Sequence, residues 1–321
     1  MIDYTIHYKE EVDVLNICEE SWDIFISAFN SSERVKQVFE QVNAADKYWL
    51  VQGDYEYQNE DLPSTGNLIN PSTQSESEFA KKVIFEIGIE TLKSKSVCID
   101  ITGFVKPYML TLLSFLKRSD CDKFDVLYSE PIKYSKREET KFSGSLISEV
   151  KQVVGYGGMH RSDTSNDYLI VGSGYDHDLI AYVAEDKANT RKVQMFGFPS
   201  LKPDMYQENI LRAHRAKETM DGINIRNKQN VILAPANDPF VTASELSKFY
   251  FTEHKKKPIT NLYLSPLATK PQALGFALFY LTEFCDEDSV SMIYPFSYSH
   301  SKETSKGLSR IWKYSLYFES T

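Results

Sequence analysis

The residues best suited to bind an anion follow a short apolar run in the first half of the chain. Residues 97–107 read Val-Cys-Ile-Asp-Ile-Thr-Gly-Phe-Val-Lys-Pro, so a strand is expected to end near Asp100, and Gly103 permits a tight turn into a helix. A helix that begins beside the final proline presents unpaired N–H groups and a partial positive charge. Thr102 adds a hydroxyl and Lys106 a full cation, which is the chemistry of a phosphate site. The alternative is a capping threonine followed by a solvated lysine.

The same chemistry recurs in the second half of the chain. Residues 264–271 read Leu-Ser-Pro-Leu-Ala-Thr-Lys-Pro, which again leads from an apolar run into a helix that starts with proline. Ser265 and Thr269 supply hydroxyls and Lys270 supplies a cation. We therefore predict a second anion-binding loop here.

Residues 171–178, Val-Gly-Ser-Gly-Tyr-Asp-His-Asp, form another strand-to-helix turn. Gly174 allows close backbone approach, Ser173 can bond a phosphate or ribose, and Asp176 can accept a ribose hydroxyl or cap the helix. The segment lacks the GxGxxG pattern of dinucleotide-binding folds and the GxSxG pattern of a serine nucleophile. Adjacent residues rarely converge on one ion, so we expect neither a metal site nor a nucleophile beside His177.

A further turn, at residues 234–239, contains Asn237 and Asp238 between a strand and a helix. Their side chains can read a base or sugar, or cap the helix, and capping is the favoured interpretation.

The elements that must position these loops alternate along the chain. Short apolar runs predict strands at residues 24–27, 48–51, 97–101, 124–128, 168–171, 193–196, 231–234, 261–264 and 289–294. Periodic segments predict helices at residues 32–42, 76–92, 107–117 and 242–252. Such alternation is typical of an α/β fold with a mostly parallel sheet covered on both faces. Ligands bind such sheets at the carboxyl ends of the strands, where the loops above are expected to lie.

An internal repeat indicates that one unit occurs twice. At a shift of 164, 12 of the 35 residues from 106 to 140 are identical, including Lys106 with Lys270 and Cys121 with Cys285. Chance would give about two identities at average composition. Residues 24–30 also resemble residues 170–176 at a shift of 146, so the second copy carries about 18 extra residues. We predict two tandem Rossmann-like units, residues 1–150 and 151–321, related by a pseudo-twofold axis.

Composition restricts the function classes. The 45 acidic and 36 basic residues give a net charge of −9, which argues against duplex nucleic acid as the main partner. No apolar run reaches the 18 residues of a membrane span, and the N-terminus has no signal-peptide pattern. The four widely spaced cysteines include no CxxC pair, as expected for buried thiols in a reducing cytoplasm. We expect no metal and no bound cofactor.

The loop from Asp100 to Met109 resembles the Asp-x-Thr-Gly-Gly-Thr-Lys-Pro-Met loop of CRISPR-associated Rossmann-fold (CARF) sensor domains. The related SAVED domains of antiphage signalling are similar to two such units in one chain. The resemblance implies a cyclic oligonucleotide ligand, with Thr102, Gly103 and Lys106 on one side. Thr269 and Lys270 would lie on the other side. Phe-Val replaces the usual Gly-Thr after Gly103, and the second copy has Pro-Leu-Ala where glycine is expected.

These observations favour a cytoplasmic sensor that binds a phosphate-containing nucleotide between two repeated units. Because the two units use nearly the whole chain, output would require a protein effector or self-association. The rival is an enzyme acting on a nucleotide or nucleoside, a phosphodiesterase of ring-nuclease type or an N-glycosidase, with Asp100, Asp176 or Asp238 as base. No convincing acid–base pair or nucleophile supports it. A third interpretation is a structural subunit of a defence complex.

Overall fold

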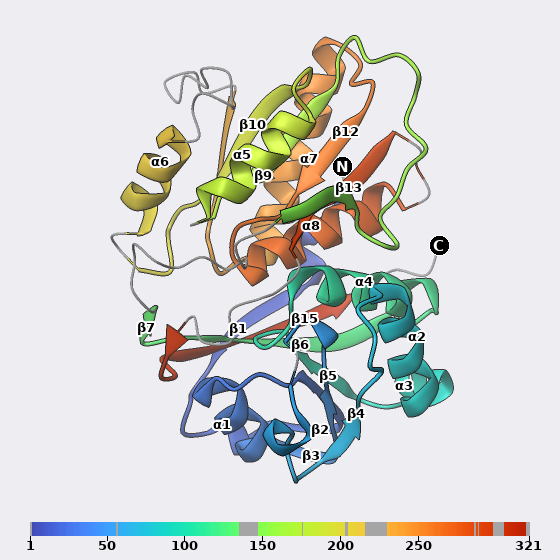
Figure 1. Cartoon of the computed structure of the whole chain (residues 1–321), viewed down its shortest axis with the longest axis vertical. Coiled ribbons are helices and arrows are strands. Elements are labelled where there is room, and N and C mark those ends of the chain that lie inside the picture. The colour runs from blue at the N-terminus through green and yellow to red at the C-terminus, as the bar shows by residue number, and fades with distance from the viewer. Residues whose placement is uncertain are drawn as a thin grey trace. The chain divides into compact units, whose positions relative to one another are not determined.

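Two compact units, each built on its own sheet, make up the chain (Figure 1). The computed structural model describes residues 2–55, 57–134, 147–174, 176–202, 205–215, 230–285, 287, 289–297 and 305–318. The seven-stranded unit comprises Ile6–Gly144 and Tyr298–Thr321, and the six-stranded unit comprises Met1–Thr5 and Ser145–Ser297. The predicted α/β class with mostly parallel sheets is confirmed.

The seven-stranded sheet has the order β1-β15-β6-β5-β2-β3-β4. Its strands are β1 (Tyr8–Val12), β2 (Ser21–Ala28), β3 (Asn43–Leu50), β4 (Asn67–Ile69), β5 (Val97–Asp100), β6 (Lys123–Glu130) and β15 (Arg310–Tyr317). Five neighbouring strands run parallel to one another: β6, β5, β2, β3 and β4. Strand β15 is antiparallel to both β6 and β1. The unit's helices are α1 (Glu33–Gln41), α2 (Glu76–Ile87), α3 (Ile89–Ser94) and α4 (Lys106–Arg118).

The six-stranded sheet has the order β11-β10-β9-β12-β13-β8. Its strands are β8 (Ile147–Gln152), β9 (Tyr168–Gly172), β10 (Arg191–Gly197), β11 (Val231–Ala234), β12 (Leu262–Ser265) and β13 (Val290–Ser297). Its helices are α5 (His177–Asp186), α6 (Met205–Arg215), α7 (Pro239–Lys256) and α8 (Lys270–Glu283). All strands are parallel except β8, which is antiparallel to β13.

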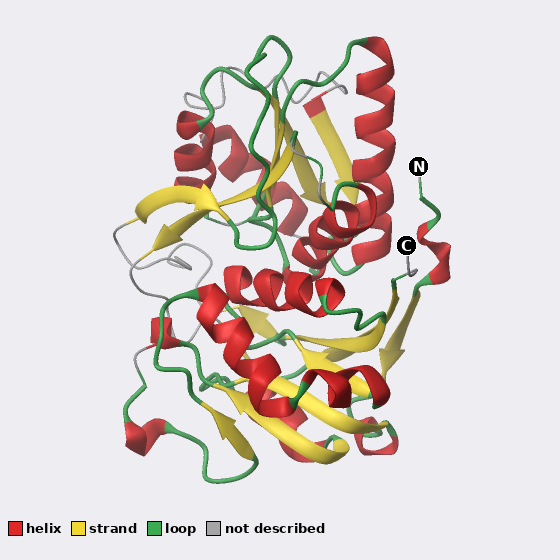
Figure 2. Ribbon diagram, turned by 90° about the vertical axis from the view of Figure 1, so that its right-hand side faces the viewer, coloured by secondary structure: helices red, strands yellow, loops and turns green. Residues whose placement is uncertain are grey.

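The central strands explain why the sheets were readable from sequence. Every residue of β5 and β9 is buried, as expected for strands covered on both faces, and Figure 2 shows helices lying over the strands of each sheet. The helix predicted at residues 76–92 is divided into α2 and α3 at Gly88, whose φ of 88° is not helical. The other predicted strands and helices are present within a few residues of their expected bounds.

The chain passes from one sheet to the other and back again. After β6 the next long strand is β8, which pairs with β13, and after β13 comes β15, which pairs with β6. Two short strands, β7 (Lys133–Tyr134) and β14 (Ser305–Lys306), pair with each other. Residues 298–321 belong to the seven-stranded unit and residues 1–5 to the six-stranded unit, so neither unit is one continuous segment like the predicted units 1–150 and 151–321.

Strand β15 is fixed in the seven-stranded sheet by buried apolar and polar contacts. Trp312 Nε1 donates to Glu130 Oε1 at 2.6 Å, and Ser315 Oγ donates to Asp125 Oδ1 at 2.6 Å. Burial alone would lower the pKa of the Lys313 ammonium, but its hydrogen bonds to Glu10 and Glu20 raise the pKa above its ordinary value. The strand lies between β1 and β6, so the sheet is incomplete without it.

Within the described residues, no helix is both long and apolar enough to cross a membrane.

Replacing a buried residue of β15 should unfold the seven-stranded unit more easily. Ile311 is fully buried in the apolar cluster of this sheet, so Ile311→Ala should lower the free energy of unfolding by about 2–4 kcal/mol. Tryptophan fluorescence during urea unfolding measures this, because all three tryptophans (Trp22, Trp49 and Trp312) belong to this unit. The control Leu15→Ala, at an 84% exposed residue, should change it by less than about 0.5 kcal/mol. Equal effects of the two variants would contradict the role assigned to β15.

His7 should make the stability of this unit depend on pH. Burial lowers the pKa of His7 from 6.5 to about 4, and its Nδ1 accepts a hydrogen bond from the backbone N–H of Tyr317 in β15. Between about pH 6.5 and pH 4 the unfolded chain binds a proton that the folded chain excludes, so stability is lost as the pH falls through this window. Urea unfolding at pH 7.5 and pH 5, compared between the native protein and His7→Gln, should show a smaller loss in the variant. The same loss in both proteins would contradict this.

Candidate functional site

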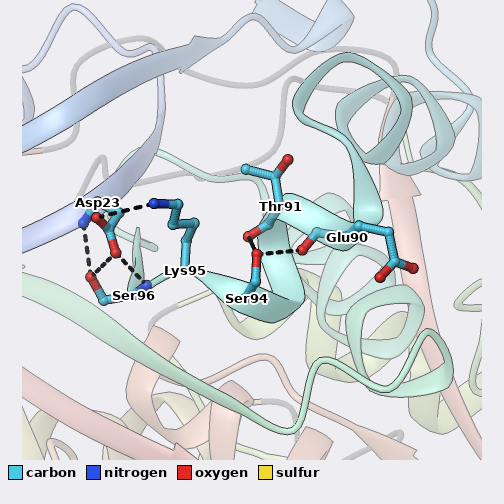
Figure 3. Close-up of polar contacts among 6 residues, drawn as sticks. All are labelled: Asp23, Glu90, Thr91, Ser94, Lys95 and Ser96. Carbon is cyan, nitrogen blue, oxygen red and sulfur yellow. Dashed lines mark hydrogen bonds and ion pairs between the residues drawn. The ribbon is translucent and has the colours of Figure 1, made fainter.

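The two ends of the seven-stranded sheet differ in their polar contacts. At the amino ends of β2 and β5, Asp23 Oδ2 accepts from the backbone N–H and the hydroxyl of Ser96, at 2.9 and 2.8 Å (Figure 3). Lys95 Nζ lies 4.0 Å from the same carboxylate. These groups are exposed and bond one another. The carboxyl ends of the strands carry buried polar groups instead, several of them with unused hydrogen-bonding capacity.

The loop after β5 is held by a buried carboxylate. Asp100 is fully buried, and it accepts from Ser27 Oγ at 3.0 Å and from the backbone N–H of Thr102 at 2.9 Å. Thr102 Oγ1 in turn accepts from the backbone N–H of Ser129 at 2.9 Å. Thr102 is therefore not the cap of α4, the alternative considered above. Asp100 and Thr102 instead fix the shape of the predicted loop and join it to the end of β6.

Gln52, which follows β3, supports the same loop from the other side. Its Oε1 accepts from the backbone N–H of Val105 at 2.7 Å, and its Nε2 donates to the carbonyl oxygen of Gly103 at 3.4 Å. Helix α4 begins at Lys106, which is half-buried, and the N-cap residue Val105 offers no side-chain hydrogen bond. The N-terminus of α4 thus has a cation in its first turn and no capping side chain.

A close backbone contact joins the loops after β2 and β5. A Cβ on Gly103 would lie 2.0 Å from the carbonyl oxygen of Ala28, so only glycine fits there. In the six-stranded unit, a Cβ on Gly174 would lie 2.4 Å from the carbonyl oxygen of Leu267. The repeat shifts align Ala28 with Gly174 (28 + 146) and Gly103 with Leu267 (103 + 164). The same two loops therefore touch in both units, with the required glycine in opposite loops, and this favours the inferred duplication.

In the six-stranded unit, Ser173 and Ser265 lie at the ends of the neighbouring strands β9 and β12. Both are buried, and within the described part of the chain neither Oγ has a hydrogen-bond partner. His177 Nε2 lies 3.5 Å from Asp178 Oδ1. Ser173 is therefore not arranged as a nucleophile activated by His177.

Three of the remaining predicted residues of this unit, Asp176, Asp238 and Thr269, cap helix N-termini. Asp176 Oδ1 accepts from the backbone N–H of Leu179 at 3.4 Å, and Asp238 Oδ1 accepts from two N–H groups of α7 at 3.1 Å. Thr269 caps α8 and donates to the carbonyl oxygen of Ala236 at 2.5 Å. Asn237 and Lys270 are half-buried beside these caps. Capping, the interpretation favoured above for Asp238, is the role the structure gives it.

Arg34 is a polar residue at this edge that the sequence analysis missed. It lies in the first turn of α1, only 8% exposed, and Nη1 donates to the carbonyl oxygen of Ser129. A helical pattern suggests a solvated arginine here, but Arg34 precedes Val38 by one turn and lies on the same buried face as Val35 and Phe39. The spacing of Arg34 from Val38 and Phe39 could therefore have indicated that its side chain is buried.

The structure groups the predicted residues by unit. Asp100, Thr102, Gly103 and Lys106 belong to one loop of the seven-stranded unit, and the other eight belong to the six-stranded unit. The predicted pseudo-twofold cleft concerns the arrangement of the two units, and it stays a prediction. Comparison of the chain with protein-family models and with curated proteins finds no match.

Adding a methyl group to Gly103 should damage the fold. Because the Cβ would collide with backbone rather than with a flexible side chain, we expect Gly103→Ala to lower the free energy of unfolding by about 3 kcal/mol. Urea unfolding followed by far-UV circular dichroism, which reports on the secondary structure of both units, measures this. The control Gly157→Ala should cost little, since its Cβ would meet only the end of the Gln152 side chain. An unchanged midpoint for Gly103→Ala would show that the loops separate without cost.

Proposed function

We propose that the chain is a cytoplasmic sensor that binds a phosphate-containing nucleotide at the carboxyl ends of its two sheets. The observation that carries this proposal is the loop from Thr102 to Lys106. It lies where ligands bind in open α/β sheets, it has a rigid hydrogen-bonded shape, and it ends in a helix N-terminus with a lysine and no side-chain cap. Backbone N–H groups and a cation are suited to phosphate oxygens.

The carboxylates of the site support binding over catalysis. A general base must be free to take a proton from a substrate. Asp100 accepts from Ser27 and Thr102, and both Asp176 and Asp238 accept from helix N–H groups. All three candidate bases thus stabilise local backbone structure. We therefore favour a binding protein over a phosphodiesterase or an N-glycosidase.

The resemblance to CARF and SAVED domains narrows the proposed ligand to a cyclic oligonucleotide of antiphage signalling. Such a ligand carries several phosphates, which suits one lysine-bearing loop in each unit, Lys106 and Lys270. Ligand occupancy would then be passed to an effector protein or to self-association.

Thermal unfolding with nucleotides tests the proposal. The probes are 5′-mononucleotides, linear dinucleotides and cyclic di-, tri- and tetranucleotides, and one of them should raise the melting temperature because it binds the folded state. Lys106→Ala and Lys270→Ala should each weaken binding about tenfold or more, since each removes a charge-assisted contact. The exposed lysine variants Lys82→Ala and Lys248→Ala, one in each unit, serve as controls.

Two results would contradict the proposal. One is that no nucleotide stabilises the chain. The other is that both loop variants bind as tightly as the controls. Chromatography of the bound nucleotide after incubation separates binding from turnover, and a hydrolysed or cleaved product would favour the enzyme instead.

A further inference from the structure

Arg34 carries a buried charge with unused hydrogen-bonding capacity. Its side chain is 8% exposed, and among the described residues its only hydrogen bond runs from Nη1 to the carbonyl oxygen of Ser129. Its Nε is buried and has no partner there, and no described Asp or Glu forms an ion pair with it. Burying a guanidinium without an anionic partner is costly, so such groups are normally paired.

Two residues linked to Arg34 by sequence or by hydrogen bonding also have hydroxyls without a partner. The hydroxyl of Ser129, the residue whose carbonyl Arg34 binds, is buried without a partner in the described chain, and so is the hydroxyl of Ser31, three residues before Arg34. Helix α1 is nine residues long, and its N-cap residue Ser32 makes no side-chain cap. The guanidinium, the two hydroxyls and the helix N-terminus thus belong to residues at the carboxyl ends of β2 and β6.

This cluster connects to the loop of the proposed nucleotide site. The backbone N–H of Ser129 donates to Thr102 Oγ1, while its carbonyl oxygen accepts from Arg34. One residue therefore ties the segment after β2 to the loop after β5. The bond to Ser129 uses Nη1, so the N–H of Nε remains a donor without a partner among the described residues.

We infer that Arg34, with Ser129 and Ser31, forms a phosphoryl subsite of the seven-stranded unit. The inference rests on the proposed function and adds the residue that supplies the charge. An oxyanion with several acceptor oxygens matches a planar fork of donors, two hydroxyls and helix N–H groups together. A carboxylate, with two oxygens, uses fewer of these donors. Lys106 and Arg34 would then contact different oxygens or different phosphates of one nucleotide.

Titration of the full chain with inorganic phosphate tests the subsite. At constant ionic strength, phosphate should raise the melting temperature of the native protein saturably, and acetate should not. Arg34→Met should weaken phosphate binding at least tenfold. Lys36→Met, which removes an exposed cation from the same helix, should change it less than twofold. Without phosphate, Arg34→Met should melt at or above the native temperature, because it removes a buried unpaired charge.

Ser129→Ala provides a second variant should Arg34→Met fail to fold. It removes one donor without changing charge and should weaken phosphate binding several-fold. The inference is overturned if phosphate binding is absent from the native protein, if it is unchanged in Arg34→Met, or if acetate binds equally well.

The nucleotide panel separates the two proposals. A nucleotide that binds the native protein and Arg34→Met alike contradicts the subsite and leaves the proposed function standing. Phosphate binding that depends on Arg34, with no nucleotide bound, supports the subsite and contradicts the proposed function.

Discussion

The approach of two backbone segments at the carboxyl edge is the constraint on which the site depends. Where the loops after β2 and β5 meet, a carbonyl oxygen occupies the space that a Cβ would need, so one partner must be glycine. That contact allows Asp100 to bridge the two strands and brings Thr102 to Ser129. Lys106 follows one of these loops at the start of α4, and Arg34 follows the other in the first turn of α1. The distance between these two loops thus decides whether Asp100, Thr102 and Ser129 can bond as they do.

Strand β15 supports this edge from the opposite flank. Glu130, next to Ser129, accepts from the backbone N–H of Ser309 through its carbonyl oxygen and from Trp312 through its carboxylate. The end of β6 is therefore held between the loop after β5 and a strand that lies some 180 residues further along the chain. Ser129, whose carbonyl oxygen accepts from Arg34, is held in place by the bond from its N–H to Thr102 and by the bonds of the next residue, Glu130. Contacts made by residues some 180 positions further along the chain therefore help to position the polar groups at the carboxyl edge.

Sequence alone predicted the central strands and the strand-end loops, because strands buried on both faces are continuous apolar runs. It predicted no strand at residues 310–317, so it predicted neither β15 nor the sheet to which β15 belongs. It could not explain why the loop at Leu267 lacks the expected glycine, because the steric constraint acts on a pair of positions and the glycine of that pair is Gly174. It missed Arg34, because one arginine in an amphipathic helix is ordinary until the buried face is known.

The crossing of strands between the two sheets has a consequence for biosynthesis. Domains usually fold as they leave the ribosome, from the N-terminus onward. Here the sheet assembled from residues 8–130 lacks an inner strand until residues 310–317 have been translated. During that interval β6 presents an unpaired edge that invites other strands, which is a risk for aggregation. Production of this protein should therefore respond to chaperone supply and to slower translation.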